Sequence, residues 1–204
     1  MKKLIIFLLA SIISFSAAAE FRWGPIIGVN GSSLYWKQDL VTTKYKIGGS
    51  AGILGELMIP GIGFGIDMAL RYQLNGAKVN FGERLIWSGA PDYMGNEDVW
   101  IHTIQVPVNL RFKYTRLDGL ERTIAPFAFA GPVFTFNVAT SNIPVIEKPG
   151  GTVDIQVGAG AELIERLQIS GGYYWGVSYQ VRTIKLDNFS ARPQGWFINA
   201  AWLF

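Results

Sequence analysis

The stretch that decides the fold is residues 100–114, which read WIHTIQVPVNLRFKY. Its even positions are almost wholly apolar and carry aromatic residues near both ends, whereas its odd positions carry amides, a hydroxyl and two cations. Successive side chains of a strand point to opposite faces, so a strand here would have one apolar and one polar face. Strands of soluble proteins usually have about 5–6 residues. A longer strand with these faces is typical of one that crosses a bilayer.

The first nineteen residues have the pattern of an export signal. Lys2 and Lys3 precede an apolar run over residues 4–13, and Ala17, Ala18 and Ala19 form a small-residue cleavage site. We expect Sec-dependent export, cleavage near Ala19, and residues 20–204 as one domain.

The composition favours a membrane barrel. Charged residues make up 16% and hydrophobic residues 50% of the chain, against about 25% charged residues in ordinary soluble domains. After the signal no apolar run reaches the roughly 18 residues of a membrane helix. Cysteine is absent, which excludes a disulfide scaffold and an N-terminally acylated lipoprotein. The basic residues are scattered rather than clustered, which argues against nucleic-acid binding.

Seven further segments alternate in the same way. They are residues 22–34, 47–59, 63–75, 122–138, 152–164, 167–182 and 193–204. The connections alternate between long and short, and the long ones cover residues 35–46, 76–98, 139–151 and 183–192. Bacterial outer-membrane barrels have an even strand number, short periplasmic turns and longer extracellular loops. We therefore predict an all-β fold, an eight-stranded antiparallel up-and-down transmembrane β-barrel with a polar filled interior, in the bacterial outer membrane.

Two prolines interrupt this pattern. Phe127 and Phe129 share one parity whereas Phe134 and Phe136 share the other, with Gly131-Pro132 between the pairs. We predict a β-bulge at that dipeptide which shifts the register by one residue. Pro107 removes a ladder hydrogen bond in mid-strand and predicts a second local bulge.

The chemistry of the faces indicates which one points outward. A lipocalin-like barrel would have the reverse orientation, but its solvent face would be dense in Lys and Glu, whereas the polar face here holds mainly Gly, Ser, Thr, Asn and Gln. Aromatic residues near the predicted strand ends form two girdles, as expected where a barrel meets both interfaces. The girdle residues are Trp23, Phe64, Tyr72, Trp100, Phe112, Tyr114, Tyr179, Trp196, Trp202 and Phe204.

An eight-stranded barrel is just wide enough for side chains to fill, and buried charges must be paired. The interior faces carry an expected polar network of Glu56, Asp67, Arg71, Arg111, Lys113, Asp154, Glu162 and Arg182. Strand direction places Asp67 beside Arg111, and Asp154 beside Arg182. We interpret the network as a structural salt-bridge plug; the alternative is a proton or ion path.

The residues offer little for catalysis. His102 is the only histidine, and its parity places it on the lipid face beside Trp100. The chain has no His/Cys cluster for a metal, and we expect no catalytic site, no metal and no cofactor. Trp87, Tyr93 and Met94 in the longest loop are a possible contact site; equally, they could fold over the barrel mouth.

Six motifs resemble the PorT-type outer-membrane β-barrel family of Bacteroidetes, in order along the chain. They lie in residues 24–30 (Gly-x-Asn), 48–56, 67–78 (ending Asn-Gly-Ala-Lys), 104–114 (Val-Pro-Val-Asn-Leu), 125–132 (Ala-Gly-Pro) and 157–162 (Gly-Ala-Gly). The resemblance implies an eight-stranded outer-membrane barrel and little about activity. PorT itself is an accessory of type IX secretion. The terminal Trp202-Leu203-Phe204 resembles the aromatic-ended signal by which barrels are recognised for insertion.

These observations favour a non-enzymatic barrel with a structural or accessory role in the envelope, such as a role in protein secretion. The alternative is a binding or adhesion barrel whose long loops contact external ligands or proteins. A lipid-modifying enzyme lacks a base–nucleophile arrangement, and a conducting pore is disfavoured by the small strand number. Expected partners are outer-membrane lipid, the barrel-assembly machinery during insertion, and secretion or envelope proteins.

Overall fold

A computed structural model describes residues 20–36, 42–59, 62–80, 96–114, 119–140, 146–147, 151–179, 181–183 and 190–204. The predicted signal lies outside these residues. The described part is almost entirely β-structure, with one 3₁₀ turn, η2 (Leu120–Arg122), and no helix long and apolar enough to cross a membrane. The strands are β1 (Glu20–Trp36), β2 (Thr42–Met58), β3 (Phe64–Asn80), β4 (Asn96–Lys113), β5 (Ile124–Thr140), β6 (Ile146–Glu147), β7 (Gly151–Leu163), β8 (Leu167–Gly176), β9 (Val181–Thr183) and β10 (Ser190–Trp202).

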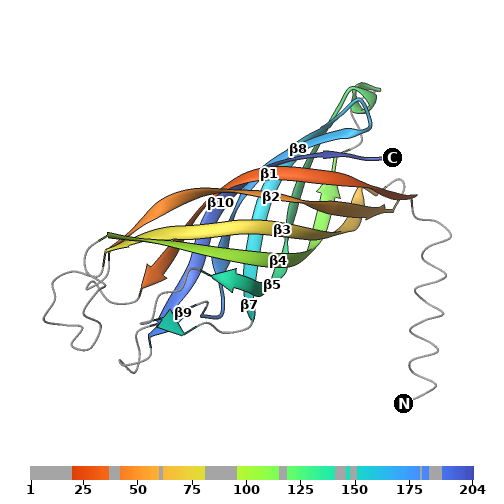
Figure 1. The fold of residues 1–204 in the computed structure, drawn as a ribbon. Helices are drawn as coiled ribbons and strands as arrows, with labels where there is room; N and C mark the ends of the chain where they lie inside the picture. The colour runs from red at the N-terminus through yellow and green to blue at the C-terminus, as the bar shows by residue number, and fades with distance from the viewer. Residues whose placement is uncertain are drawn as a thin grey trace, which may run out of the picture.

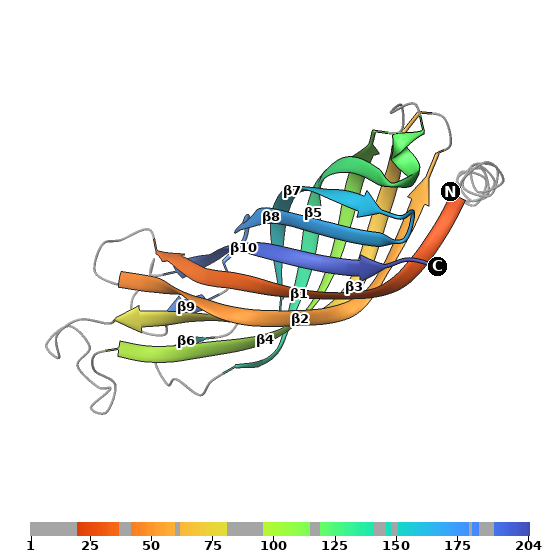
Figure 2. The same cartoon turned by 90° about the horizontal axis from the view of Figure 1, so that it is seen from above.

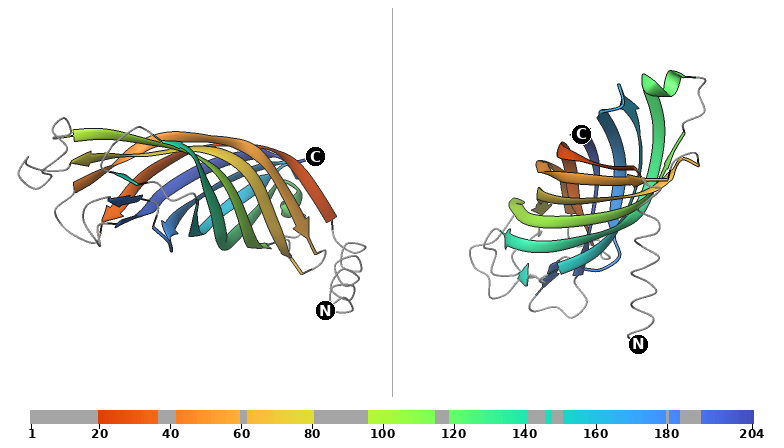
Figure 3. Two further views of the ribbon diagram at one scale, coloured as in Figure 1. Left: turned by 60° about the horizontal axis from the view of Figure 1, so that its bottom comes forward. Right: turned by 90° about the vertical axis from the view of Figure 1, so that its right-hand side faces the viewer.

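Eight long strands form a closed antiparallel barrel (Figure 1). Neighbours in the chain are neighbours in the sheet, in the order β1, β2, β3, β4, β5, β7, β8, β10, and β10 pairs with β1 to close it. Figure 3 shows the tilted strands curving around a common axis. Closure leaves no long unpaired edge, which a barrel in lipid requires because hydrocarbon cannot satisfy backbone groups. The predicted fold class is confirmed.

The two faces of β4 have the predicted orientation. All its odd positions from Val99 to Lys113 are buried inside the barrel, whereas the even positions from Trp100 to Phe112 are exposed or half-exposed on the outside. The other long strands alternate over most of their length, with runs of buried residues at 30–34 in β1 and 75–77 in β3. Large apolar side chains such as Ile53 and Leu70 therefore lie on the outer surface. An exterior of this kind would aggregate in water and is stable in lipid.

The strands extend further into the predicted loops than the apolar alternation indicated. β3 continues to Asn80 and β4 begins at Asn96, within the interval predicted as a loop over residues 76–98. Strands β1 to β4 consequently reach beyond β5, β7 and β8 at the loop end (Figure 2). The prediction was wrong because hairpin pairing continues where side chains become polar, and apolar periodicity does not detect such pairing.

Both predicted bulges are absent. The register of β5 on β7 runs without a shift from Ile124 to Phe136, past Gly131-Pro132. Phe127 and Phe129 instead point into the lumen, where Gly160 and Gly158 of β7 leave room for their rings.

At Pro107 the β3–β4 register is likewise the same on both sides, with Met68 opposite Val108 and Arg71 opposite Gln105. Pro107 therefore has no paired residue on β3, and neither strand contains an extra residue at this point. Register shifts occur elsewhere, in β2 between Tyr45 and Ser50, and between β4 and β5 at His102/Thr103.

Candidate functional site

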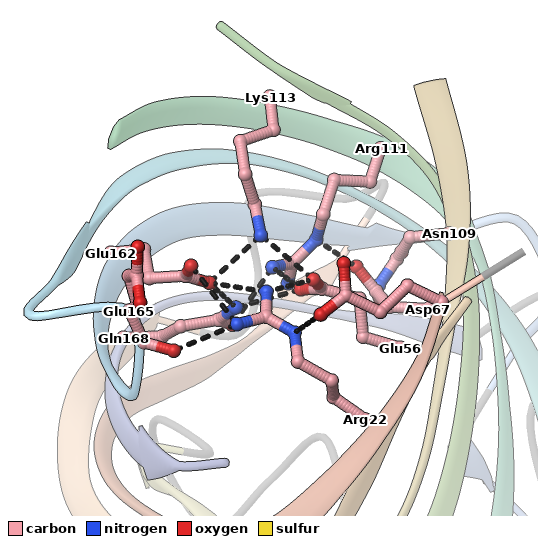
Figure 4. A network of polar contacts seen from close by, with 10 residues as sticks. Arg22, Glu56, Asp67, Asn109, Arg111, Lys113, Glu162, Glu165 and Gln168 are labelled. Carbon is pink, nitrogen blue, oxygen red and sulfur yellow. Dashed lines mark hydrogen bonds and ion pairs between the residues drawn. The ribbon is translucent and has the colours of Figure 1, made fainter. Parts of the chain in front are cut away.

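The short-turn end of the lumen holds a layer of ion pairs, which we call the ion-pair layer (Figure 4). It consists of Arg22 on β1, Glu56 on β2, Asp67 on β3, Arg111 and Lys113 on β4, and Glu162 on β7. The register brings these residues together because Arg22 lies opposite Glu56, and Glu56 opposite Asp67. Opposite residues of an antiparallel pair share a face, so these side chains all enter the lumen.

Glu56 is the centre of the ion-pair layer and is fully buried. Its Oε1 accepts hydrogen bonds from Arg22 Nη2 at 2.6 Å and Lys113 Nζ at 2.8 Å. Its Oε2 accepts from Arg111 Nη1 at 2.5 Å and Gln168 Nε2 at 2.7 Å. One carboxylate therefore joins strands β1, β2, β4 and β8 across the lumen.

Two further carboxylates complete the layer. Glu162 Oε2 lies 2.8 Å from both Arg22 Nη2 and Lys113 Nζ. Asp67 Oδ2 accepts from Arg111 Nε at 2.8 Å, which is the pair that the sequence predicted. Asp67 Oδ1 accepts from Asn109 Nδ2 at 2.6 Å, so both of its oxygens are engaged.

The ion-pair layer is electrically balanced, because its three cations face three carboxylates. Burying an isolated charge is prohibitively costly, whereas paired and hydrogen-bonded charges are tolerated. The side chains of Arg111 and Asp67 are only 4% and 2% exposed, and that of Arg22 is 15% exposed. The arrangement fills the lumen here and fixes the relative positions of six side chains.

Above this layer, Arg71 lies in a more apolar setting. It donates to Gln105 Oε1 at 3.0 Å and Gln156 Oε1 at 3.3 Å, and its Cζ lies 5.7 Å from the centre of the Phe197 ring. Among the described residues no carboxylate forms a salt bridge with it. A cavity of about 30 Å³ adjoins Arg71 and Asn199, which is room for one or two waters.

The remaining predicted network residues lie apart from the ion-pair layer. Asp154 is buried, and its Oδ2 accepts from Thr135 Oγ1 at 2.8 Å. The backbone of Arg182 belongs to β9, which pairs with β10 and β6 and not with β7. The side chain of Arg182 lies outside the described part, and so does the expected Asp154–Arg182 contact.

Nine of the ten predicted girdle residues lie at outward-facing positions of the strands or directly at their ends, whereas Tyr179 is half-exposed beyond the end of β8. Two contacts join them at the short-turn end, with ring centres 5.9 Å apart for Trp23 and Phe204 and 4.9 Å apart for Phe64 and Phe112. At the other end His102 is half-exposed on the outer face, where its Nδ1 shares a hydrogen bond with the Tyr72 hydroxyl.

The expected loop contact residues Trp87, Tyr93 and Met94 lie outside the described residues. Within the described part no His, Cys, Asp and Glu side chains form a group that could hold a metal.

The sequence reasoning missed Arg22 and Gln168 as members of the lumenal network. Arg22 shares its parity with the inward-facing Gly24 and Ile26, and this signal could have identified it. Gln168 Oε1 also accepts from Arg111 Nη1 at 2.8 Å, and its place on a polar face near a tight turn was visible in the sequence.

Comparison with solved structures agrees with this architecture. The outer-membrane protein OprG from Pseudomonas aeruginosa is similar over 92% of this chain and 96% of its own, with a TM-score of 0.54 and 10% identity. The chain has the fold of an outer-membrane β-barrel. Neisserial surface protein A (TM-score 0.48, 11% identity, 91% and 99% covered) and Ail of Yersinia pestis (0.44, 13%, 91% and 99%) are less similar in structure.

At these identities the likeness concerns the fold alone. No family model matches the chain, and no curated protein matches its sequence.

Proposed function

We propose that this chain is a non-enzymatic barrel of the bacterial outer membrane, with a structural or accessory role in the envelope and a lumen that does not conduct ions. The ion-pair layer is the observation that carries the proposal. It joins strands on opposite sides of the barrel by contacts of 2.5 to 2.8 Å around Glu56. A buried cluster of Phe127, Phe129, Tyr174 and Phe197 adjoins it, with Arg111 Cζ 4.2 Å from the centre of the Phe127 ring.

The location is supported by the lipid-compatible exterior and the OprG-like fold. A role in protein secretion, like that of PorT, is the specific form of the proposal that the six sequence motifs support. Outer-membrane lipid, the barrel-assembly machinery and secretion components are the corresponding partners.

Planar-bilayer recording tests the closed lumen. We expect no steady discrete conductance from the purified, refolded protein, with insertion verified by a shift between heated and unheated samples on electrophoresis. Steady single-channel steps would overturn the proposal.

Crosslinking in native membranes tests the accessory role, for which we expect recovery of secretion or envelope-assembly proteins.

The second candidate function is a binding barrel that displays its loops. The observation that favours it is the unequal strand length, since β3 and β4 have 17 and 18 residues whereas β8 has 10. A membrane crossing needs about 9–11 residues, so we infer that the β1–β4 wall, which reaches past β8 at the loop end in Figure 2, rises above the bilayer. Crosslinks to an external ligand, with none to envelope proteins, would favour this function over the first.

A further inference from the structure

Three lysines gather on the outer face at the loop end of strands β2 and β3. Lys44 lies directly opposite Lys78, and Lys78 lies directly opposite Asp98 of β4. Opposite residues of antiparallel strands share a face, and like charges placed so are destabilising. Lys44 and Lys78 are both exposed, and among the described residues neither forms a salt bridge with a carboxylate. The strand pairing therefore places two like charges side by side on the outer face.

The third lysine, Lys46, is held in place by its surroundings. Lys46 is only 7% exposed, and its Nζ lies 3.3 Å from Asp98 Oδ2 and 3.6 Å from the centre of the Trp100 ring. Gly76 leaves space for its stem, since a Cβ there would stand 3.0 Å from Lys46 Cδ. The ammonium has three protons to donate, yet it makes no hydrogen bond within the described part of the chain. Its Nζ has essentially no exposed surface, so Lys46 neutralises Asp98 at this position and does not itself reach an external ligand.

The position along β3 gives the level of this cluster in a membrane. Outward apolar side chains run from Phe64 to Leu74. Ten residue steps at about 3.4 Å, tilted by about 40°, give a band about 25 Å tall, the usual height in such barrels. Lys78 lies four residues further, or about 10 Å higher, which corresponds to the headgroup region of the leaflet.

We propose that Lys44 and Lys78, beside the Lys46–Asp98 ion pair, bind the phosphate monoester of a lipid headgroup in the outer leaflet. The inference rests on the outer-membrane orientation proposed above. Three lysines and Asp98 leave a net charge of +2 at the site, which matches the charge of about −1.5 to −2 of a phosphate monoester. The apolar outer wall of β3 directly below, which includes Tyr72, would contact the acyl chains of a lipid. A soluble phosphate has no such second contact.

Native mass spectrometry of the purified full-length barrel in detergent micelles tests this site. The probes are phosphatidic acid and the diacylglycerol with the same acyl chains, which differ only by the phosphate monoester. We expect phosphatidic acid to bind at least about tenfold more tightly than diacylglycerol. Replacing Lys44→Gln and Lys78→Gln together should weaken phosphatidic acid binding by about tenfold or more, because two charge-assisted hydrogen bonds are lost, and should leave diacylglycerol binding unchanged.

The matched control replaces Arg122→Gln and Arg166→Gln, two exposed cations at the short-turn end, and should keep the wild-type affinity. Equal phosphatidic acid binding by the lysine variant and the wild type would overturn the site. Inorganic phosphate that binds as tightly as phosphatidic acid would overturn the assignment to a lipid. Either failure would leave the closed-barrel proposal standing, because that proposal depends on the ion-pair layer and is tested by conductance.

Discussion

Removal of the Glu56 carboxylate is the most direct test of the ion-pair layer. The substitution Glu56→Ala deletes four hydrogen bonds, three of them from cations, at a side chain with no exposed surface. It leaves Arg22, Arg111 and Lys113 facing only Asp67 and Glu162, a buried excess of one positive charge. Removing one partner of a buried pair typically costs about 3–5 kcal/mol, and we expect a loss of unfolding free energy in that range.

The assay is equilibrium unfolding by urea in lipid vesicles, followed by tryptophan fluorescence. Because the charges are buried, added salt should recover little of the loss. The control is a charge-balanced double variant, Glu56→Gln with Lys113→Met. Its loss of unfolding free energy should be smaller, by about 1–3 kcal/mol, than the summed losses of Glu56→Gln alone and Lys113→Met alone. A loss below about 1 kcal/mol for Glu56→Ala, or strict additivity in the double variant, would refute the view that these charges are mutually neutralised.

Two further experiments test the packing of the lumen and the tight turn after β7. Gly158→Val should destabilise the barrel by about 1–3 kcal/mol because its side chain would overlap the Phe129 ring; adding Phe129→Leu should restore part of this loss, measured by the same unfolding assay, and no restoration would argue against an inward ring. Ile164 and Glu165 have positive φ values of 53° and 58° in the tight turn after β7. Residues other than glycine and asparagine adopt this backbone conformation at an energetic cost. Ile164→Asn with Glu165→Gly should therefore raise the unfolding free energy by about 1–2 kcal/mol, and an unchanged urea midpoint would contradict this.

The architecture could be predicted from the sequence because a barrel in lipid has two different solvents on its two faces. In β4 the rule is followed from Val99 to Lys113 without exception. The alternation within one strand shows which of its faces is apolar, so the outward face can be assigned without knowing the neighbouring strands. The rhythm of long and short connections then supplies the direction of each strand, and together these fix the fold class.

The lumenal arrangement needs information that one strand does not contain. A bulge at Gly131-Pro132 was predicted because Phe127 and Phe129 share one parity whereas Phe134 and Phe136 share the other. Phe127 and Phe129 point inward because Gly160 and Gly158 lie on the neighbouring strand at the matching register positions, and this depends on pairing between distant segments. The parity of Arg22 with Gly24 and Ile26 was visible in the sequence, but its partners Glu56 and Glu162 lie on other strands.

The kind of side chain that fills the barrel changes along its axis, and this layering supports the proposed closed lumen. The ion-pair layer lies at the short-turn end, and the aromatic side chains around Phe197 come next. Amides and hydroxyls follow, where Asn75 Oδ1 accepts from Gln73 Nε2 at 2.7 Å and Asn30 Nδ2 at 3.1 Å. Buried apolar residues then line the loop end, as Val79 and Val99 show. An ion would have to cross both charged and apolar layers, so loss of Glu56 alone should destabilise the barrel without creating a conducting path.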